Sequence, residues 1–281
     1  MKYFIFALLI LLAFVLTAGE FEYKLIETKS EKEITLPELA EQALQYDVIF
    51  FGELHDDELL HHLEFELLKE MQAIYPELIV SMEMFERDVQ SEVDAYLADE
   101  ISEEEFILAA RAWPNYEQDY KPIVDFAKEH QLTLVAANIP RRFAAMINKQ
   151  GMNALDSLSA EDKKYVAKKH KVFEDEYKER FFQTMKQNLA NLPQNPMGMK
   201  MDFDALYAAQ CLKDDTMAES ILQYQRIPPR RKVLHFNGDF HSRKHLGTAQ
   251  KIQVLEPMLK IAVITPVEVQ NELSTTKEDL Q

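Results

Sequence analysis

Five short apolar segments constrain the fold of this 281-residue chain more than any other feature. Each has four or five residues rich in Val, Ile, Leu or Phe, which suits a buried strand, and long helix-like stretches separate the first four. Strands that alternate with helices form a parallel sheet, because parallel neighbours need long crossovers. The sequence therefore predicts an α/β fold, mainly a parallel sheet flanked by helices. The segments are 48–51, 78–82, 132–136, 232–236 and 261–264.

The stretch 143–226 interrupts this alternation and predicts a smaller helical insertion; packing of its helices on the main sheet is the alternative. Ser159-Ala-Glu-Asp162 resembles a capping box and predicts a long charged helix through Tyr165, His170 and Tyr177. The predicted division is a signal peptide at 1–19, an α/β domain in two parts at 20–142 and 227–270, the insertion at 143–226, and a polar tail at 271–281.

The first 19 residues have the pattern of a secretory signal. Lys2 precedes an apolar run from Tyr3 to Leu16, and small residues follow. We expect cleavage after Ala18 or Gly19 and an exported, periplasmic or envelope-associated protein; an uncleaved anchor is the alternative. No cysteine follows the run, so lipidation is not supported.

Charge and composition exclude several classes of function. The formal net charge is −17, and it becomes −18 without Lys2, which argues against nucleic acid as a partner. The chain has only six glycines and no phosphate-cradling glycine loop. Cys211 is the only cysteine, so no intrachain disulfide can form.

Carboxylates and imidazoles follow the predicted strands. Glu53 and His55 follow the first strand, Glu83 the second and His241 the fourth. Because the carboxyl ends of parallel strands share one edge, we expect these four side chains to meet in one crevice. They suit Zn²⁺, Mn²⁺ or Fe²⁺, and equally suit general acid–base catalysis at a carbonyl. A buried, hydrogen-bonded polar network is the structural alternative.

Other residues near these strand ends have narrower predicted roles. Asp239 is a candidate to orient His241, and Gly238 permits a tight turn or a close approach of the backbone. Arg141-Arg142 could hold a carboxylate or phosphate, or be solvated. Helical periodicity turns His61 towards the crevice and His62 towards solvent.

Tyrosines in the predicted insertion raise a different possibility, because phenolate is an axial ligand for haem iron. Tyr165, Tyr177 and Tyr207 all lie there, and ordinary packing is the alternative for each. Positive charge gathers around Tyr165, from Lys163, Lys164, Lys168 and Lys169. Met197, Met199 and Met201 could line an apolar pocket or fill gaps between helices.

Between Val48 and Ile264 the chain resembles the ChaN-like haem-binding proteins. They belong to a wider group, with Tiki-type proteases and erythromycin esterases, that shares a Gly-Glu-x-His signature. The motifs that carry the resemblance occur in order: Gly52-Glu-Leu-His55, the His61-His62 doublet, Met82-Glu-Met-Phe85, Trp113 with Tyr120-Lys-Pro122, Asn138-Ile-Pro140, Gln210-x-x-x-Asp214-x-x-Met217-Ala218 and Gly238-x-x-His241.

The resemblance implies that haem binds at a homodimer interface, with a tyrosine as axial ligand and His or Lys near the propionates. It also implies a role in bacterial haem or iron uptake, with possible association with an envelope or outer-membrane haem receptor. The family's lipidation cysteine is absent. The doublet comes about one residue late, which favours His61 as the family's second histidine. The alternative function is a metal-dependent hydrolase, a peptidase or esterase, that uses the crevice; catalysis is left open. The candidate haem-binding residues are Tyr165, Tyr177, Lys169, His170 and His61.

Overall fold

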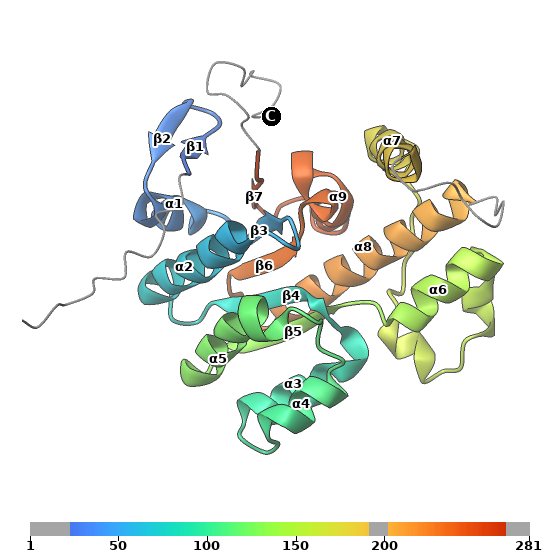
Figure 1. The fold of residues 1–281 in the computed structure, drawn as a ribbon, viewed down its shortest axis with the longest axis horizontal. Helices are drawn as coiled ribbons and strands as arrows, with labels where there is room; N and C mark the ends of the chain where they lie inside the picture. Colours follow the sequence, from blue (N-terminus) through green and yellow to red (C-terminus); the bar gives the residue numbers. More distant parts are fainter. Residues whose placement is uncertain (1–22, 191–201, 268–281) are drawn as a thin grey trace, which may run out of the picture.

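The computed structural model describes residues 23–190 and 202–267 (Figure 1). The predicted signal peptide, the methionines at 197, 199 and 201, and the polar tail lie outside these ranges. Within them, no helix is both long enough and apolar enough to span a membrane.

A parallel sheet of five strands forms the centre of the described structure, in the order β5-β4-β6-β3-β7. The predicted parallel α/β architecture is therefore confirmed. The order makes β4, β6 and β3 neighbours, so their polar carboxyl ends lie side by side. The strands are β3 (Val48–Glu53), β4 (Ile79–Glu86), β5 (Thr133–Asn138), β6 (Val233–Gly238) and β7 (Ile261–Ile264).

Both faces of the sheet are apolar because successive side chains of a strand point to opposite sides. Ile49 and Phe51 of β3 pack in the larger core with α2 (Glu58–Ile74) and α5 (Lys121–Glu129). Val48 and Phe50 pack on the other side, with α8 (Phe203–Gln225) and α9 (Gly247–Leu255). Because helices cover both faces of the sheet, polar functional side chains can gather only at the ends of its strands.

Smaller elements complete the fold. An antiparallel hairpin, which the sequence patterns did not predict, precedes the first helix. Thr35 caps that helix in a reciprocal box with Glu38. The elements are β1 (Leu25–Glu27), β2 (Lys32–Ile34), α1 (Leu36–Ala43), α3 (Gln90–Leu97), α4 (Glu103–Ala109), α6 (Arg141–Gln150) and α7 (Glu176–Ala190), with short helical turns η1 (Arg87–Val89), η2 (Tyr116–Tyr120, a π-helix), η3 (Met152–Ser157), η4 (Asp162–Tyr165), η5 (Asp239–His241) and η6 (Arg243–His245).

The predicted long helix from Ser159 through Tyr177 is wrong. Ser159 does cap a turn, but only η4 follows, and α7 begins at Glu176. The stretch between them is held against α8 by contacts that compete with helix formation. Backbone N–H groups of this stretch donate to α8 side chains: Ala167 to Thr216, Lys168 to Glu219 and Lys171 to Asp215.

Helix α8 connects the helical region to the sheet, as Figure 1 shows. Its residues Ala218 and Ile221 pack in the core beneath β3. Nearer its start, Tyr207 and Cys211 pack against Tyr177 of α7. The alternative of helices packed on the main sheet therefore holds for part of α8, and the boundaries of a separate insertion stay a prediction.

Candidate functional site

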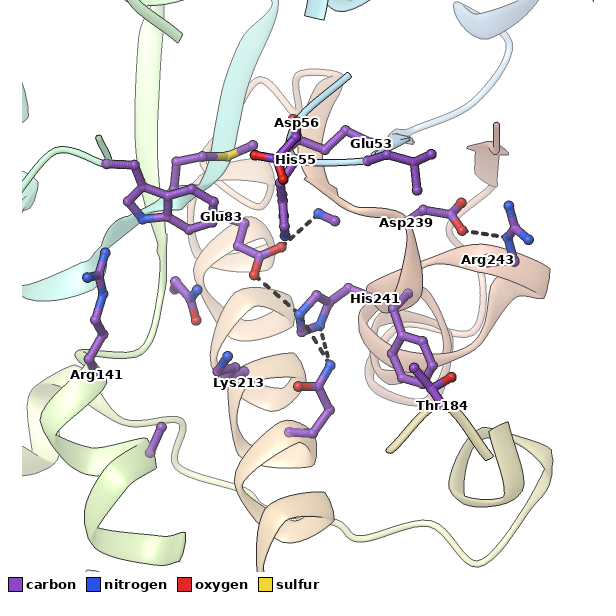
Figure 2. Close-up of a pocket in the computed structure, with 18 of the residues that line it drawn as sticks. Glu53, His55, Asp56, Glu83, Arg141, Thr184, Lys213, Asp239, His241 and Arg243 are labelled. Carbon is purple, nitrogen blue, oxygen red and sulfur yellow. Dashed lines mark hydrogen bonds and ion pairs between the residues drawn. The ribbon is translucent and has the colours of Figure 1, made fainter. Parts of the chain in front are cut away.

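A crevice of about 1470 Å³ opens at the carboxyl ends of the strands (Figure 2). This volume exceeds the ~300–1,000 Å³ of ordinary small-molecule sites. Glu53 and His55 enter the crevice from the end of β3, Glu83 from β4 and His241 from η5 after β6. The prediction that these four side chains meet at one sheet edge is confirmed.

Glu53 and His55 form the first pair in the crevice. His55 Nδ1 lies 2.5 Å from Glu53 Oε1, and the Tyr120 hydroxyl donates to the same oxygen at 2.8 Å. The hydrogen bond to Glu53 raises the pKa of His55, although burial opposes this change. Glu53 is buried and His55 half-exposed, so the pair presents a proton-bearing imidazole to the crevice.

The second pair consists of Glu83 and His241, and Asp214 of α8 extends it. His241 lies between the two carboxylates, with Nε2 3.2 Å from Glu83 and Nδ1 2.6 Å from Asp214. Burial disfavours the imidazolium, but the two carboxylates outweigh burial and raise the pKa of His241 to about 10. Burial alone would raise the pKa of Glu83, whereas His241 lowers it well below its ordinary value.

Gly238 allows the two pairs to approach each other. A Cβ at this position would lie 2.8 Å from His55 Nε2 and 3.6 Å from Glu83 Oε2. The Gly238 N–H also donates to that Glu83 oxygen at 2.9 Å. The arrangement can accept, hold and return a proton close to a bound molecule.

Asp239 does not orient His241, so this expectation is wrong. In Figure 2 Asp239 pairs instead with Arg243, at 2.5 Å, and it also accepts from Thr265. Asp214 takes the predicted role, because α8 passes beneath His241. The sequence placed Asp239 near His241 along the chain, but the turn η5 separates their side chains.

The four crevice residues form two pairs, and both nitrogens of His241 face carboxylates or the Gln210 amide. A shared metal at all four stays a prediction. A compact donor group does occur among the described residues, but it consists of Glu53, His61 and Glu64, whose ligand atoms lie within 4.8 Å of one another. His61, which was expected to face the crevice, is buried beside Glu53, 3.5 Å from its Oε2, and His62 is exposed as predicted.

Basic side chains line the mouth of the crevice and can receive an anionic group. Lys213 and Arg180 belong to this lining, together with Arg141. Arg141 also pairs with Glu86 at 3.0 Å, while Arg142 pairs with Asp88 and Asp162. Both arginines are exposed, and both already pair with acidic side chains.

A family model described as haem-binding uptake, Tiki superfamily, ChaN matches residues 39–252, most of the chain. The chain belongs to the ChaN family. A solved structure, "Cofacial heme binding to ChaN of Campylobacter jejuni", has the same fold, with a TM-score of 0.69 and 21% identity over 88% of this chain and 91% of that one. The effector domain RRSP of a Vibrio vulnificus toxin aligns with 76% of this chain and 32% of its own, at 14% identity and a TM-score of 0.42. No curated protein matches.

The residues proposed for haem from the ChaN resemblance do not form one cluster. Tyr165 lies in η4 and is partly exposed beside α6, and Lys169 and His170 are exposed in the following stretch. Tyr177 is fully buried, with its hydroxyl donating to Asp214 at 2.8 Å. His61 is buried elsewhere, beside Glu53. Their roles stay predictions.

Two fully buried acids close to the crevice residues, Glu64 and Asp214, were not among the predicted site residues. Glu64 follows Leu60 by four residues, about one helical turn, so it lies on the apolar face of α2. A carboxylate is rarely found on such a buried face. That position was the available clue. Asp214 belongs to a quoted family motif, but its partnership with His241 depends on where α8 crosses the sheet.

Raising the pH from 7 to 10 is expected to destabilise the protein through His241. Its folded pKa of about 10 lies above the ordinary 6.5, so its contribution to stability is complete below pH 6.5 and declines as pH approaches 10. These two pKa values correspond to a loss on the order of 3 kcal/mol between pH 7 and pH 10, which urea unfolding measures. The His241 ring resonance, identified by its absence from His241→Gln, should titrate near pH 10; titration near 6.5 would contradict the geometry.

Proposed function

We propose that this chain binds haem and that Tyr165 is the axial ligand. Membership of the ChaN family supports binding. The observation that selects Tyr165 is the state of its hydroxyl, which has no hydrogen-bond partner among the described residues. By contrast, the Tyr207 hydroxyl donates to the Phe173 carbonyl at 2.8 Å, and Tyr177 donates to Asp214. Tyr165 alone of these three is partly exposed.

The surroundings of Tyr165 suit a flat, anionic ligand. Lys168 and Lys169 are exposed close by in the chain, and the Arg142 guanidinium lies 6.0 Å from the Tyr165 ring. These cations are suited to pair with haem propionates. Partly buried Met146 and Met152 belong to the same apolar cluster and offer a surface for the macrocycle. Bound haem would supply ferric iron, for which phenolate is a suitable ligand.

A homodimer is part of the proposal. The ChaN of Campylobacter jejuni, which shares this fold, is described as binding haem cofacially. Haem seated on an exposed tyrosine would leave one broad apolar face in water, and a second copy with its own haem would cover that face. We further propose a role in haem or iron uptake after export, in association with an envelope haem receptor.

Titration of the haem-free protein with haemin tests the proposed function. We expect one haem per chain, with a dissociation constant of micromolar or tighter, and an absorption spectrum typical of ferric haem with a tyrosinate ligand. Sedimentation should show a dimer in the haem-bound sample. Absence of binding at micromolar haemin would reject the proposed function.

Export is tested by the intact mass of the protein isolated from its native cell envelope. We expect the mass of a chain that begins after Ala18 or Gly19, because Lys2 and the apolar run Tyr3–Leu16 match a cleaved signal. A mass that includes Met1 would contradict cleavage and favour an anchor.

The metal-dependent hydrolase is the less supported alternative. The family match is to proteins described as haem-binding, and the comparisons give no hydrolytic activity for this chain. In the crevice, His55 and His241 both have raised pKa values, so protonation competes with metal coordination at these rings.

A further inference from the structure

Where β3 ends and α2 begins, three buried side chains form a second group of possible ligands. Glu53 comes from the end of β3, and His61 and Glu64 come from the first two turns of α2. One ligand atom from each lies within 4.8 Å of the other two, and all three side chains are at least nine-tenths buried.

Two of the three separations between these donor atoms suit ligands of one metal ion. His61 Nδ1 lies 3.2 Å from Glu64 Oε2 and 3.5 Å from Glu53 Oε2. Donors bound tetrahedrally at about 2.0–2.1 Å from an ion lie about 3.3–3.4 Å apart. The two measured separations fall on either side of that value.

The orientation of His61 is that of a metal ligand. Its Nε2 lies 3.1 Å from the backbone carbonyl of His55, which can only accept, so Nε2 carries the proton. In the neutral ring the lone pair of Nδ1 then faces two carboxyl groups, a repulsive arrangement unless a metal ion or a proton lies between them. Histidine ligands commonly donate their other N–H to a carbonyl in this way.

Two carboxylate oxygens in the group have no hydrogen-bond partner among the described residues, and burial together with the neighbouring Glu53 raises the pKa of Glu64. Glu53 Oε2 and Glu64 Oε1 are buried without a hydrogen bond, which is costly for charged groups. Within the described part of the chain, Glu53 and Glu64 form ion pairs with histidines alone. Asp119 adds a further negative charge 3.6 Å from His61 Nε2, from the π-helix η2, a rare element often found at functional sites.

We propose that Glu53 Oε2, His61 Nδ1 and Glu64 hold a divalent first-row metal ion. One imidazole and two carboxylates suit Zn²⁺ or Mn²⁺. The ion would join β3 to α2. It would also fix the Glu53 carboxylate, whose other oxygen contacts His55 in the crevice. A proton shared among the same three groups is the competing occupant.

Zinc binding to the haem-free, chelator-treated full chain tests this proposal. Wild type should bind one tight equivalent of zinc chloride by calorimetry, or of manganese chloride in a parallel titration, with a matching rise in thermal midpoint. Glu64→Gln and His61→Phe should weaken this equivalent roughly 100-fold or more, since loss of an outer partner alone costs 10–100-fold. Glu66→Gln is the matched control, because Glu66 lies on the same helix and pairs with Lys69.

Three outcomes overturn the proposal. Wild type that binds neither ion tightly would assign the site to a shared proton. A tight equivalent retained in both Glu64→Gln and His61→Phe would place the ion elsewhere. Equal loss of binding in Glu66→Gln would show that the effect comes from the helix surface. Circular dichroism of each variant in chelator establishes that it is folded, and His61→Phe retains a ring against Tyr120, which His61 contacts edge-on.

Discussion

Replacement of Tyr165 by phenylalanine is expected to abolish the tyrosinate absorption of the haem complex and to weaken haemin binding at least about tenfold, or about 1.4 kcal/mol. The change removes only the oxygen. The ring stays in the apolar cluster beside α6, where no hydrogen bond to the hydroxyl from a described residue is lost. Absorbance titration of wild type and variant measures both effects.

Tyr46→Phe is the matched control for this experiment. Tyr46 is also exposed, but it lies at the opposite end of the strands, just before β3. We expect its spectrum and affinity to equal those of wild type. An unchanged spectrum in Tyr165→Phe would reject Tyr165 as the ligand and direct the same substitution to Tyr177 and Tyr207.

Asp214→Ala is expected to lower the free energy of unfolding by about 3–5 kcal/mol, the usual cost of breaking a buried charge pair. Asp214 is fully buried and accepts from the Tyr177 hydroxyl, His241 Nδ1 and the Thr248 hydroxyl, at 2.8, 2.6 and 2.8 Å. Alanine would leave all three donors without their acceptor. Urea unfolding at pH 7 measures the loss.

Asp204→Ala provides the comparison on the same helix. Asp204 is exposed and pairs with Lys178 at 2.9 Å, an interaction of about 0–1 kcal/mol for surface ion pairs. We expect its unfolding midpoint to stay close to that of wild type. If both variants lost a similar amount of unfolding free energy, the loss in Asp214→Ala could not be assigned to the hydrogen bonds of Asp214. That result would contradict the prediction.

Short-range sequence patterns were sufficient for the sheet and for part of the crevice. A four-residue apolar run such as Val48–Phe51 suits a strand buried on both faces, and the alternation of such runs with helices favoured a parallel sheet. Parallel strands end at one edge, so the meeting of Glu53 with His241 followed from the strand positions alone. Helical periodicity was equally reliable for exposed His62.

Contacts between distant segments decided the rest. Residues 166–175 have the charge pattern of a helix, yet Asp215 and Glu219 of α8 draw their N–H groups into another conformation, which no local pattern encodes. The sequence determined which polar side chains reach the strand ends, because that depends on alternation along one strand. Only the tertiary structure decided that Asp214, rather than Asp239, holds His241, because a partner is chosen by the path of α8 across the sheet.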